Sequence, residues 1–434
     1  MISKARHIKD TKRLVGSLQT IKYLEPKYIY LATANARCSS AEIFINVGDH
    51  VNMYQVIGIR HAGFFDQPIH SSVSGTYVGL EKHYHRNGKL TDFIKIENDF
   101  KNTADPSVKE RTPEEISKLS KEEMTEIIKN CALVGLGGSS FPTYVKFQTD
   151  KKLNLLLVNG IECEPYITSD HRIMLEYPYR IINGIKYAMQ AFGIKRALIC
   201  IKSKYTDIKA AYDKVLKEFP NSGIEICELK NYYPQGWEVA MIKEATGIKL
   251  NPGELPSSRG IINFNVSTIV GIYKAIKYNM PVIKRNITVT GDGINQPHNF
   301  RVFVGTLIQD LLPLCGGYKE QEKEKVFILG GPMMGASIPS DDAVITKTVT
   351  SIIVLNKTNY KEEPCVRCGS CVLSCPVGLE PVQIMNAVKS LDKERIKALN
   401  PLKCIECGLC AYSCTSKIQV TDYVRRAKIF AKLW

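Results

Sequence analysis

Residues 365–376 read CVRCGSCVLSCP, and residues 404–415 repeat the pattern as CIECGLCAYSCT. Both stretches space four cysteines as C-x2-C-x2-C-x3-C, the spacing that holds paired [4Fe–4S] clusters. In each stretch a short loop with a glycine after the second cysteine lets three thiolates converge on one cube. The fourth cysteine begins a departing helix and reaches the other cube. The spacing therefore predicts two ligand sets: Cys365, Cys368, Cys371 and Cys414 for one cluster, and Cys404, Cys407, Cys410 and Cys375 for the other.

The segment between the two stretches, VQIMNAVKSLDKERIKALN (382–400), has helical spacing and is expected to form the connecting helix. The alternative to two iron–sulfur clusters is two zinc sites, but those usually combine paired C-x2-C motifs with histidine. Thr415 stands after the last cysteine, where a proline is usual, which alters the expected turn and not the ligands. Two neighbouring clusters would form a short path for single electrons.

Composition and charge restrict the class of protein. The chain has 434 residues, 44% of them apolar and 23% charged, which excludes a mostly disordered chain and favours about three domains. The net charge of +15 favours anionic partners, but no nucleic-acid-binding motif accompanies it. We expect no transmembrane helix, because no apolar run of about 18 residues occurs, and we expect a cytoplasmic chain. In a reducing compartment, eight grouped cysteines out of 14 indicate metal ligation rather than disulfides.

A glycine-rich stretch, VGLGGSSFPTYVKF, occupies residues 134–147. A helical pattern precedes it at residues 122–134, and a buried strand is predicted after it at residues 153–160. Its three glycines let the backbone approach a ligand closely and offer N–H groups to a phosphate. Lys146 adds a positive charge one turn further on.

The acidic segment IECEP (161–165) follows the predicted strand, at the edge where α/β sheets bind ligands. Taken alone, the glycine loop is equally compatible with a tight turn. Glu162 and Glu164 are equally compatible with a solvated strand end. The two cysteine stretches change that balance, because a pair of clusters needs a site where electrons enter.

These residues also carry a resemblance to a known family. GLGGSSFPTYVKF followed by VNGIECEPYITSDHRIM resembles the flavin- and NADH-binding region of the RnfC family, a component of Rnf electron transport complexes. It is similar, more distantly, to the NADH-binding flavoprotein subunit of respiratory complex I. Two later pieces also resemble that family, YPQGWE (233–238) and FNVST (264–268). The residues that the resemblance assigns to cofactor binding are Gly135, Gly137, Gly138, Ser140, Phe141, Lys146, Asn159, Glu162, Glu164, Glu238, Asn265 and Thr268.

The resemblance also implies roles. The glycine loop would cradle the FMN phosphate and lie under NADH, with Lys146 on the phosphate side. Asn159 and the two glutamates after it would contact the flavin or the nicotinamide ribose, and Asn265 would face the flavin. Trp237 departs from the pattern, since the family has a glycine there, and it would either crowd the nicotinamide or stack on it. Arg259 stands in a loop where the family is apolar.

Further stretches resemble other modules of the same family. Residues 43–60 and 68–80 alternate apolar and polar residues like the barrel-sandwich hybrid of lipoyl carriers. The expected hairpin tip, Phe64 to Gln67, has no lysine to modify, so we interpret this module as structural or docking. His83 and His85 are expected in a solvated loop rather than at a metal ion.

Residues 284–318 predict two strands around a Gly-Asp-Gly turn and then a short helix, which resembles the β-grasp SLBB module. The apolar, glycine-rich stretch 326–338 contains Met333 and Met334, which we expect in the core.

The predicted fold is therefore an α/β multidomain chain. It has a barrel-sandwich hybrid, a Rossmann-like flavin- and NADH-binding α/β domain, a β-grasp SLBB module and a C-terminal ferredoxin-like α-helical domain with two [4Fe–4S] clusters. The expected bounds are 1–30 for an unplaced segment, 31–100 for the hybrid, 101–124 for a linker, 125–283 for the FMN/NADH domain, 284–350 for the SLBB module and 351–434 for the cluster domain.

The resemblance implies a component of an ion-translocating ferredoxin:NAD+ oxidoreductase that passes electrons between NAD(H), FMN and two [4Fe–4S] clusters. Its expected partners are other Rnf-type subunits, including integral-membrane ones, a ferredoxin-like carrier and NADH, with no nucleic acid. It would lie peripherally on the cytoplasmic side of the membrane. The alternatives are a soluble reductase built from the same modules, such as a corrinoid reductase or a proline-reductase-associated electron carrier, and a cluster-carrying adaptor without NADH activity. No catalytic residue is assigned.

Overall fold

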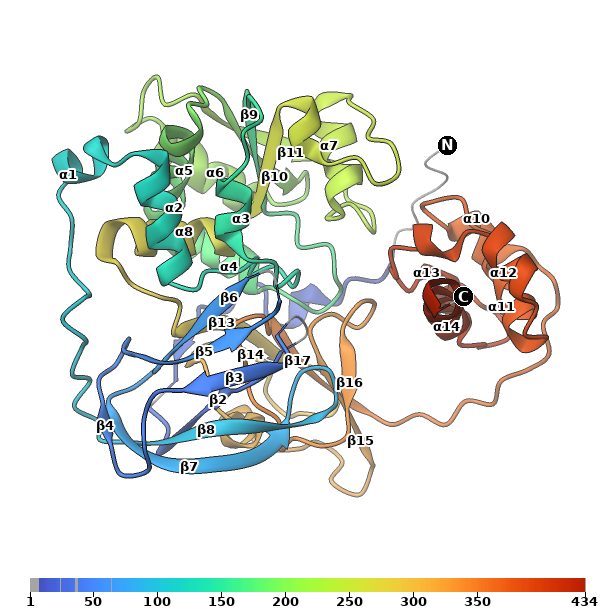
Figure 1. The fold of residues 1–434 in the computed structure, drawn as a ribbon. Helices are drawn as coiled ribbons and strands as arrows, with labels where there is room; N and C mark the ends of the chain where they lie inside the picture. Colours follow the sequence, from blue (N-terminus) through green and yellow to red (C-terminus); the bar gives the residue numbers. More distant parts are fainter. Residues whose placement is uncertain (1–7, 24, 36–37, 64, 434) are drawn as a thin grey trace.

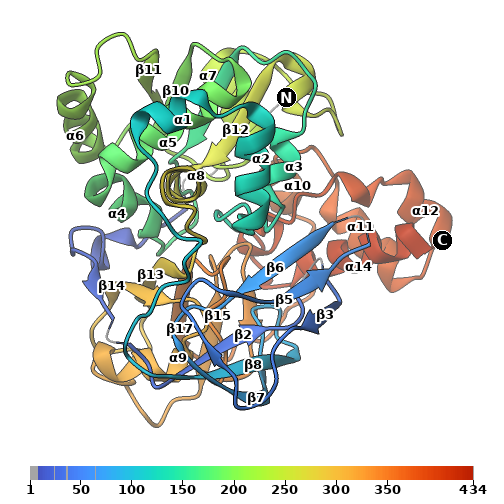
Figure 2. The same cartoon turned by 60° about the vertical axis from the view of Figure 1, so that its left-hand side comes forward.

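A computed structural model describes residues 8–23, 25–35, 38–63 and 65–433. An α/β domain lies above two layers of β-structure, and a small helical domain sits at one side (Figure 1). The view turned by 60° shows the same separation of the helical domain from the two larger parts (Figure 2). No helix within the described residues is long and apolar enough to span a membrane.

The α/β domain is built on a four-stranded parallel sheet in the order β11-β10-β9-β12. Alternate residues of each strand face opposite layers, because side chains in a strand point to alternate sides. Leu156 and Val158 of β9 join the core under the helices α2, α5, α6 and α8, whereas Leu157 packs with α7. The strands are β9 (Leu155–Asn159), β10 (Ala197–Lys202), β11 (Ile224–Leu229) and β12 (Ile261–Asn265).

Local signals explain where the helices of this domain begin and end. Ser120 and Glu123 form a capping box at the start of α2, which confirms the predicted helix there, although it ends at Asn130. Asn265 caps α8 through its side chain. The helices are α2 (Lys121–Asn130), α3 (Thr143–Phe147), α4 (Ser169–Glu176), α5 (Pro178–Phe192), α6 (Thr206–Leu216), α7 (Glu238–Thr246), α8 (Val266–Tyr278) and the 3-10 turn η2 (Pro256–Arg259).

The predicted alternating strands near the N-terminus form two small sheets, β2-β8-β7-β4 and β3-β5-β6. The hairpin β5–β6 turns at residues 62–65, of which Phe64 lies outside the described residues. The expected linker contains a helix, α1 (Pro113–Lys118), because Thr112 and Glu115 form a capping box. The strands are β2 (Tyr28–Ala32), β3 (Ser40–Ile43), β4 (His50–Val51), β5 (Val56–His61), β6 (Asp66–His70), β7 (Gly75–Tyr84) and β8 (Leu90–Asn98).

The lower sheet has six strands in the order β1-β14-β13-β17-β15-β16. The predicted pair of strands around a Gly-Asp-Gly turn is confirmed, and so is the short helix after it. Met334 was expected in the core, but it is 52% exposed, because residues 330–335 form the turn between β15 and β16. The elements are η1 (Lys12–Leu14), β1 (Ile21–Lys22), β13 (Lys284–Thr290), β14 (His298–Phe303), α9 (Ile308–Leu311), η3 (Leu312–Cys315), β15 (Lys325–Leu329), β16 (Ala336–Ile338) and β17 (Ser351–Asn356).

The C-terminal domain is helical, but the single helix predicted for residues 382–400 is wrong. The chain breaks at Leu391, whose φ is 54°, and Asp392 caps a new helix by accepting a hydrogen bond from the Arg395 amide at 3.0 Å. The helices are α10 (Ser370–Ser374), α11 (Pro381–Lys389), α12 (Lys393–Ala398), η4 (Pro401–Lys403), α13 (Leu409–Tyr412) and α14 (Val420–Leu433).

Gly291 is a position in the lower sheet where a side chain has no room. Its φ is 125°, and a Cβ atom there would lie 1.9 Å from the Val354 carbonyl oxygen. We expect Gly291→Ala to lower the free energy of unfolding by about 2–4 kcal/mol, because backbone atoms must move. Gly48→Ala is the matched control, since φ is 98° and the space is open, and it should cost about 1–2 kcal/mol. Urea unfolding of both variants measures the difference, and equal losses would contradict the steric argument.

Candidate functional site

One large cavity collects seven of the twelve residues that the resemblance assigns to cofactor binding. It lies at the carboxyl ends of β9 and β12 and opens to solvent. Its volume, with the solvent-filled mouth included, is about 1350 Å³. The turn at residues 330–335 and residues 348–350 form another wall. The seven predicted residues in the lining are Gly137, Gly138, Asn159, Glu162, Glu164, Glu238 and Asn265.

The glycine loop approaches Asn265 so closely that only glycine fits at one position. A Cβ atom at Gly137 would lie 2.8 Å from the Asn265 side chain. Gly138 has a φ of 106° and nothing within 4 Å of the place where its Cβ would stand, so its backbone faces open space. Thr268 holds the loop from behind, since its hydroxyl accepts a hydrogen bond from the Leu136 amide at 3.0 Å.

Asn265 is fixed by hydrogen bonds at both ends of its amide. Its oxygen accepts from the Ser267 backbone amide at 2.9 Å, and its nitrogen donates to Asp170 at 2.7 Å. The Ser267 hydroxyl donates to the same carboxylate at 2.6 Å. Burial, followed by the neighbouring Glu162 carboxylate, raises the pKa of Asp170 to about 6. The strand end therefore presents a rigid polar wall to the cavity.

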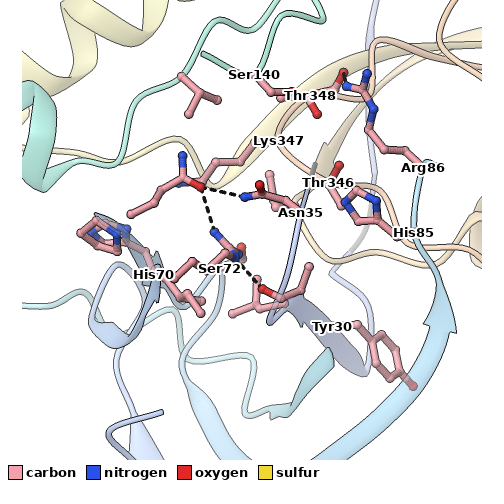
Figure 3. Close-up of a pocket in the computed structure, with 18 residues that line it drawn as sticks. Tyr30, Asn35, His70, Ser72, His85, Arg86, Ser140, Thr346, Lys347 and Thr348 are labelled. Carbon is pink, nitrogen blue, oxygen red and sulfur yellow. Dashed lines mark hydrogen bonds between the residues drawn. The ribbon is translucent and has the colours of Figure 1, made fainter. Parts of the chain in front are cut away.

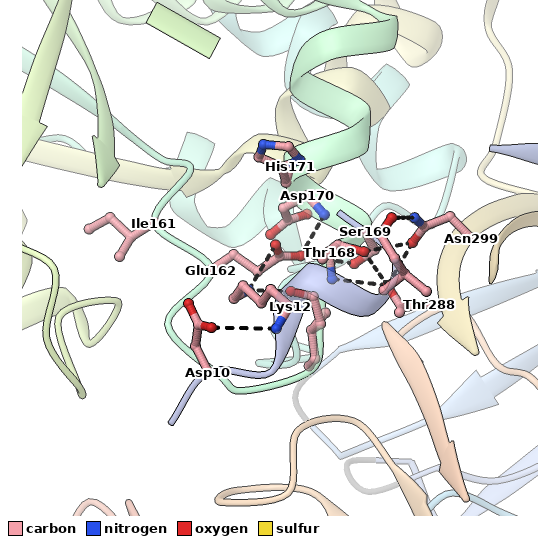
Figure 4. A network of polar contacts seen from close by, with 12 residues as sticks. Asp10, Lys12, Ile161, Glu162, Thr168, Ser169, Asp170, His171, Thr288 and Asn299 are labelled. Carbon is pink, nitrogen blue, oxygen red and sulfur yellow. Dashed lines mark hydrogen bonds and ion pairs between the residues drawn. The ribbon is translucent and has the colours of Figure 1, made fainter. Parts of the chain in front are cut away.

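Glu162 forms a buried ion pair with Lys12, 3.1 Å away and 150 residues earlier in the chain (Figure 4). Glu162 also accepts a hydrogen bond from the Asp170 amide at 2.7 Å. The Lys12 ammonium donates to the Ile167 carbonyl as well. Sequence reasoning missed Lys12 and Asp170. Asp170 lies within the stretch VNGIECEPYITSDHRIM, but the resemblance assigns it no role. Lys12 carries no motif, and only the fold brings it to the strand end.

Glu164 connects the cavity to the second cysteine stretch. Its carboxylate accepts a hydrogen bond from the Met333 amide at 3.1 Å and lies 3.5 Å from the Tyr233 hydroxyl. That hydroxyl donates to the Cys407 carbonyl at 2.8 Å. Burial raises the pKa of Glu164 to about 7. Ile405, one residue after Cys404, lines the same cavity.

The other five predicted residues do not line this cavity. The Lys146 ammonium donates to the Asn263 carbonyl at 2.9 Å and lies over the Phe264 ring, so the structure does not bring it to the cavity surface. Gly135 and Phe141 close the loop on itself, through a hydrogen bond of 2.8 Å from the Gly135 amide. Thr268 lies behind the loop, and Ser140 faces a different space.

Ser140 lines a second cavity, between the glycine loop and the barrel-sandwich sheets, together with His70, His85 and Lys347 (Figure 3). The expectation that His83 and His85 lie in a solvated loop is wrong. They are 5% and 3% exposed. His83 bonds Asp342 at 2.5 Å, and burial lowers the pKa of His85 to about 4.

The structure brings one predicted cysteine set together around a small cavity. Cys375, from the first stretch, lines it with Cys404, Cys407 and Cys410 from the second. Four thiol side chains around one space are a donor set that fits a [4Fe–4S] cluster. The other set is more open, since Cys365 and Cys368 are exposed. Thr415, beside Cys414, lies 3.8 Å from the Cys368 sulfur.

The two departures from the family pattern lie in different places. Trp237 lines the large cavity beside Gly236 and stands at the start of α7. Arg259 forms an ion pair with Glu254 at 2.5 Å and does not line the cavity. Trp237 is therefore the departure that bears on ligand binding.

Four known families match the chain. The RnfC barrel sandwich hybrid domain matches residues 2–101, the Nuo51 FMN-binding domain 128–274, the SLBB domain 286–337 and the 4Fe-4S dicluster domain 357–415. They confirm the predicted fold class, an FMN-binding domain and paired [4Fe–4S] clusters in place of zinc sites. The first match begins at residue 2, so it includes the segment that the sequence patterns left unplaced.

Similar proteins cover most of the chain. The C-subunit of the Na+-translocating ferredoxin:NAD+ oxidoreductase complex of Acetobacterium woodii is 34% identical over 78% of this chain and 76% of its own length. The C-subunit of the proton-translocating complex of Clostridium ljungdahlii is 35% identical over 88% and 84%. An NAD+-reducing [NiFe]-hydrogenase structure shares the fold, with a TM-score of 0.51 and 16% identity over 71% of this chain and 63% of its own.

Glu164 makes the stability of the domain depend on pH. Its folded-state pKa of about 7 exceeds the ordinary value of 4.5, so the folded chain keeps a proton that the unfolded chain releases. The free energy of unfolding should therefore fall as pH rises from about 4.5 to about 7. In Glu164→Gln that fall should shrink by about 2 kcal/mol. Urea unfolding at pH 5 and pH 8 measures it, with the exposed Glu322→Gln as control. Equal pH dependence in all three chains would contradict the assignment.

Proposed function

Because the chain belongs to the RnfC family of ion-translocating oxidoreductase complexes, we propose that its large cavity binds FMN and NAD(H) and exchanges electrons with the cysteine-bound clusters. One observation carries the proposal: the cavity that holds the predicted loop and acidic residues also includes Ile405 of the second cysteine stretch. A site for electron entry and a site for electron exit therefore share a wall.

The residues that would hold the flavin and the nucleotide are those in the lining. Gly137 and Gly138 offer backbone atoms to a phosphate, and Glu162 and Glu164 offer carboxylates to ribose hydroxyls. The fit with FMN rests on the open space beside Gly138 and on the close approach at Gly137, both of which a side chain would fill. Bound FMN supplies the chemistry that links hydride transfer to single-electron transfer.

The contacts of Tyr233 favour the second cysteine set as the first electron acceptor. Its hydroxyl joins the Glu164 carboxylate to the Cys407 carbonyl, so the cavity and the cluster loop touch through one side chain. The first set would then face a partner. Val366 and Leu373, beside its cysteines, are 68% and 62% exposed. We infer that a ferredoxin-like carrier or another subunit of the complex docks there.

The chain would act peripherally, on the cytoplasmic side of a membrane that holds the remaining subunits. The family's ion-translocating complexes supply this expectation, and the net charge of +15 supports contact with acidic surfaces. The alternative is an adaptor that carries clusters and has lost NADH binding, which would follow if Trp237 in the cavity lining crowded the nicotinamide instead of stacking on it.

An anaerobic absorbance spectrum before and after NADH tests the function. Flavin and iron–sulfur bands that both bleach on adding NADH would support electron entry in the large cavity and exit through the clusters. Cluster bands that bleach with dithionite and not with NADH would favour the adaptor.

Trp237 should stack on the nicotinamide, because its side chain lines the cavity where the family has glycine. We expect Trp237→Gly to weaken NADH binding about tenfold, the loss typical for one aromatic ring stacked on a base. Trp237→Phe keeps a ring and should bind nearly as well as the wild type. NADH titration of flavin fluorescence measures both. Tighter binding in the glycine variant would show that the tryptophan crowds the site.

Cys375 should serve the cluster of the second stretch although it stands in the first. Electron paramagnetic resonance of reduced Cys375→Ala should show loss of the same cluster that Cys407→Ala loses. Cys371→Ala should remove the other cluster, and Cys315→Ala, at a buried cysteine packed against the lower sheet, should keep both. Loss of the same cluster in Cys375→Ala and Cys371→Ala would contradict the crossed assignment.

A further inference from the structure

A small cavity beside the glycine loop is surrounded by five cationic side chains. It lies between helices α5 and α8 and strands β13 and β14 and opens to solvent. Leu136 of the glycine loop and Ser267 of α8 also line it. It is separate from the large cavity, with which it shares no lining residue. The five cations are Arg180, Lys274, Lys284, Arg285 and Arg301.

The positive charge in this cavity has no matching negative charge. No carboxylate lines it among the described residues, and within the same part of the chain none of the five cations forms an ion pair. The Asp170 carboxylate attracts Arg285 and the Glu25 carboxylate attracts Lys284, but neither carboxylate lines the cavity. Burial, with the charges of the surrounding cations, lowers the pKa of Lys274 to about 7.

Two buried donors in the lining also lack an acceptor. Arg285 is 3% exposed and Asn286 is 8% exposed. One terminal nitrogen of Arg285 donates to the Leu136 carbonyl at 2.9 Å, but its Nε has no partner, and neither has the amide nitrogen of Asn286. Buried donors are nearly always hydrogen-bonded, and leaving one unpaired is costly. Two lining residues of the cavity therefore each carry a buried donor without an acceptor.

From the charge and the unmet donors, we propose that this cavity binds a phosphate-type anion, either inorganic phosphate or the phosphoryl group of a larger ligand. Several oxygens and about two negative charges would satisfy both donors and reduce the repulsion among the cations. Arginine is well suited to this role, because its planar fork matches phosphate oxygens. The proposal does not depend on FMN or NADH binding in the large cavity.

The position of the cavity gives the anion a structural consequence. Arg285 donates a hydrogen bond to the Leu136 carbonyl, and the Leu136 amide donates one to the Thr268 hydroxyl. Ser267 donates to the Asp170 carboxylate, which also fixes Asn265. An anion here would therefore stabilise the rear of the loop whose front faces the large cavity.

The test is a calorimetric titration of the full holoprotein with inorganic phosphate, at constant ionic strength in chloride buffer. We expect saturable binding at one site and a higher thermal unfolding midpoint. Lys274→Gln and Arg301→Gln should each weaken binding at least about tenfold, because each removes a charged donor. Lys214→Gln, on the exposed face of α6, should bind like the wild type.

A second readout separates the charge argument from misfolding. Without phosphate and below pH 7, where Lys274 is charged, Lys274→Gln should unfold at a higher temperature than the wild type, because it removes one of five crowded charges. The proposal would be overturned if phosphate bound to the wild type no better than chloride. It would also be overturned if phosphate bound equally to the wild type, Lys274→Gln and Arg301→Gln. If Lys274→Gln fails to fold, Arg301→Gln alone decides, since its side chain is only half-buried.

Further arms identify the source of the phosphoryl group. If ADP binds the wild type more tightly than phosphate does, and the difference disappears in Lys274→Gln, the ligand is a nucleotide. Phosphatidylglycerol vesicles that compete with free phosphate would identify a lipid headgroup. Vesicle binding without any binding of free phosphate would overturn the enclosed site in favour of a surface attraction.

Discussion

The buried ion pair between Lys12 and Glu162 is the interaction on which the site depends. Both side chains are under a tenth exposed, so removing either would leave an unpaired charge in the interior, at a cost of about 3–5 kcal/mol. The pair fixes the N-terminal segment to the carboxyl edge of the parallel sheet. The same segment bonds Asn299 of the lower sheet through the Val15 carbonyl at 2.9 Å. Three modules are thus held at one point beside the cavity.

The electrostatics on the two faces of the glycine loop are opposite. On the front, burial raises the pKa values of the Asp170 and Glu164 carboxyls. On the rear, burial and then the neighbouring cations lower the pKa of Lys274. Neither side is at its electrostatic minimum as the chain stands alone, which is typical of surfaces arranged for charged ligands rather than for maximal stability.

Much of the fold was predictable, because its signals are local. Cysteine spacing, the strand ending at Asn159 and the Gly-Asp-Gly hairpin depend on residues close in sequence. The helix break at Leu391 was not visible, since helical spacing continues through it and the break depends on an end cap. At the site, the glycine loop could be found by its motif. Lys12 could not, because a single lysine carries no pattern and its partner is 150 residues away.

The two cysteine sets also differ in how solvent reaches them. Cys407 and Cys410 are 7% and 9% exposed, whereas Cys365 and Cys368 lie open on the surface. Dioxygen and chelators therefore meet the outer sulfurs first. Damage in air would proceed inward, and the cluster beside the large cavity would survive longest. The order in which the clusters decay would follow the burial of their ligands.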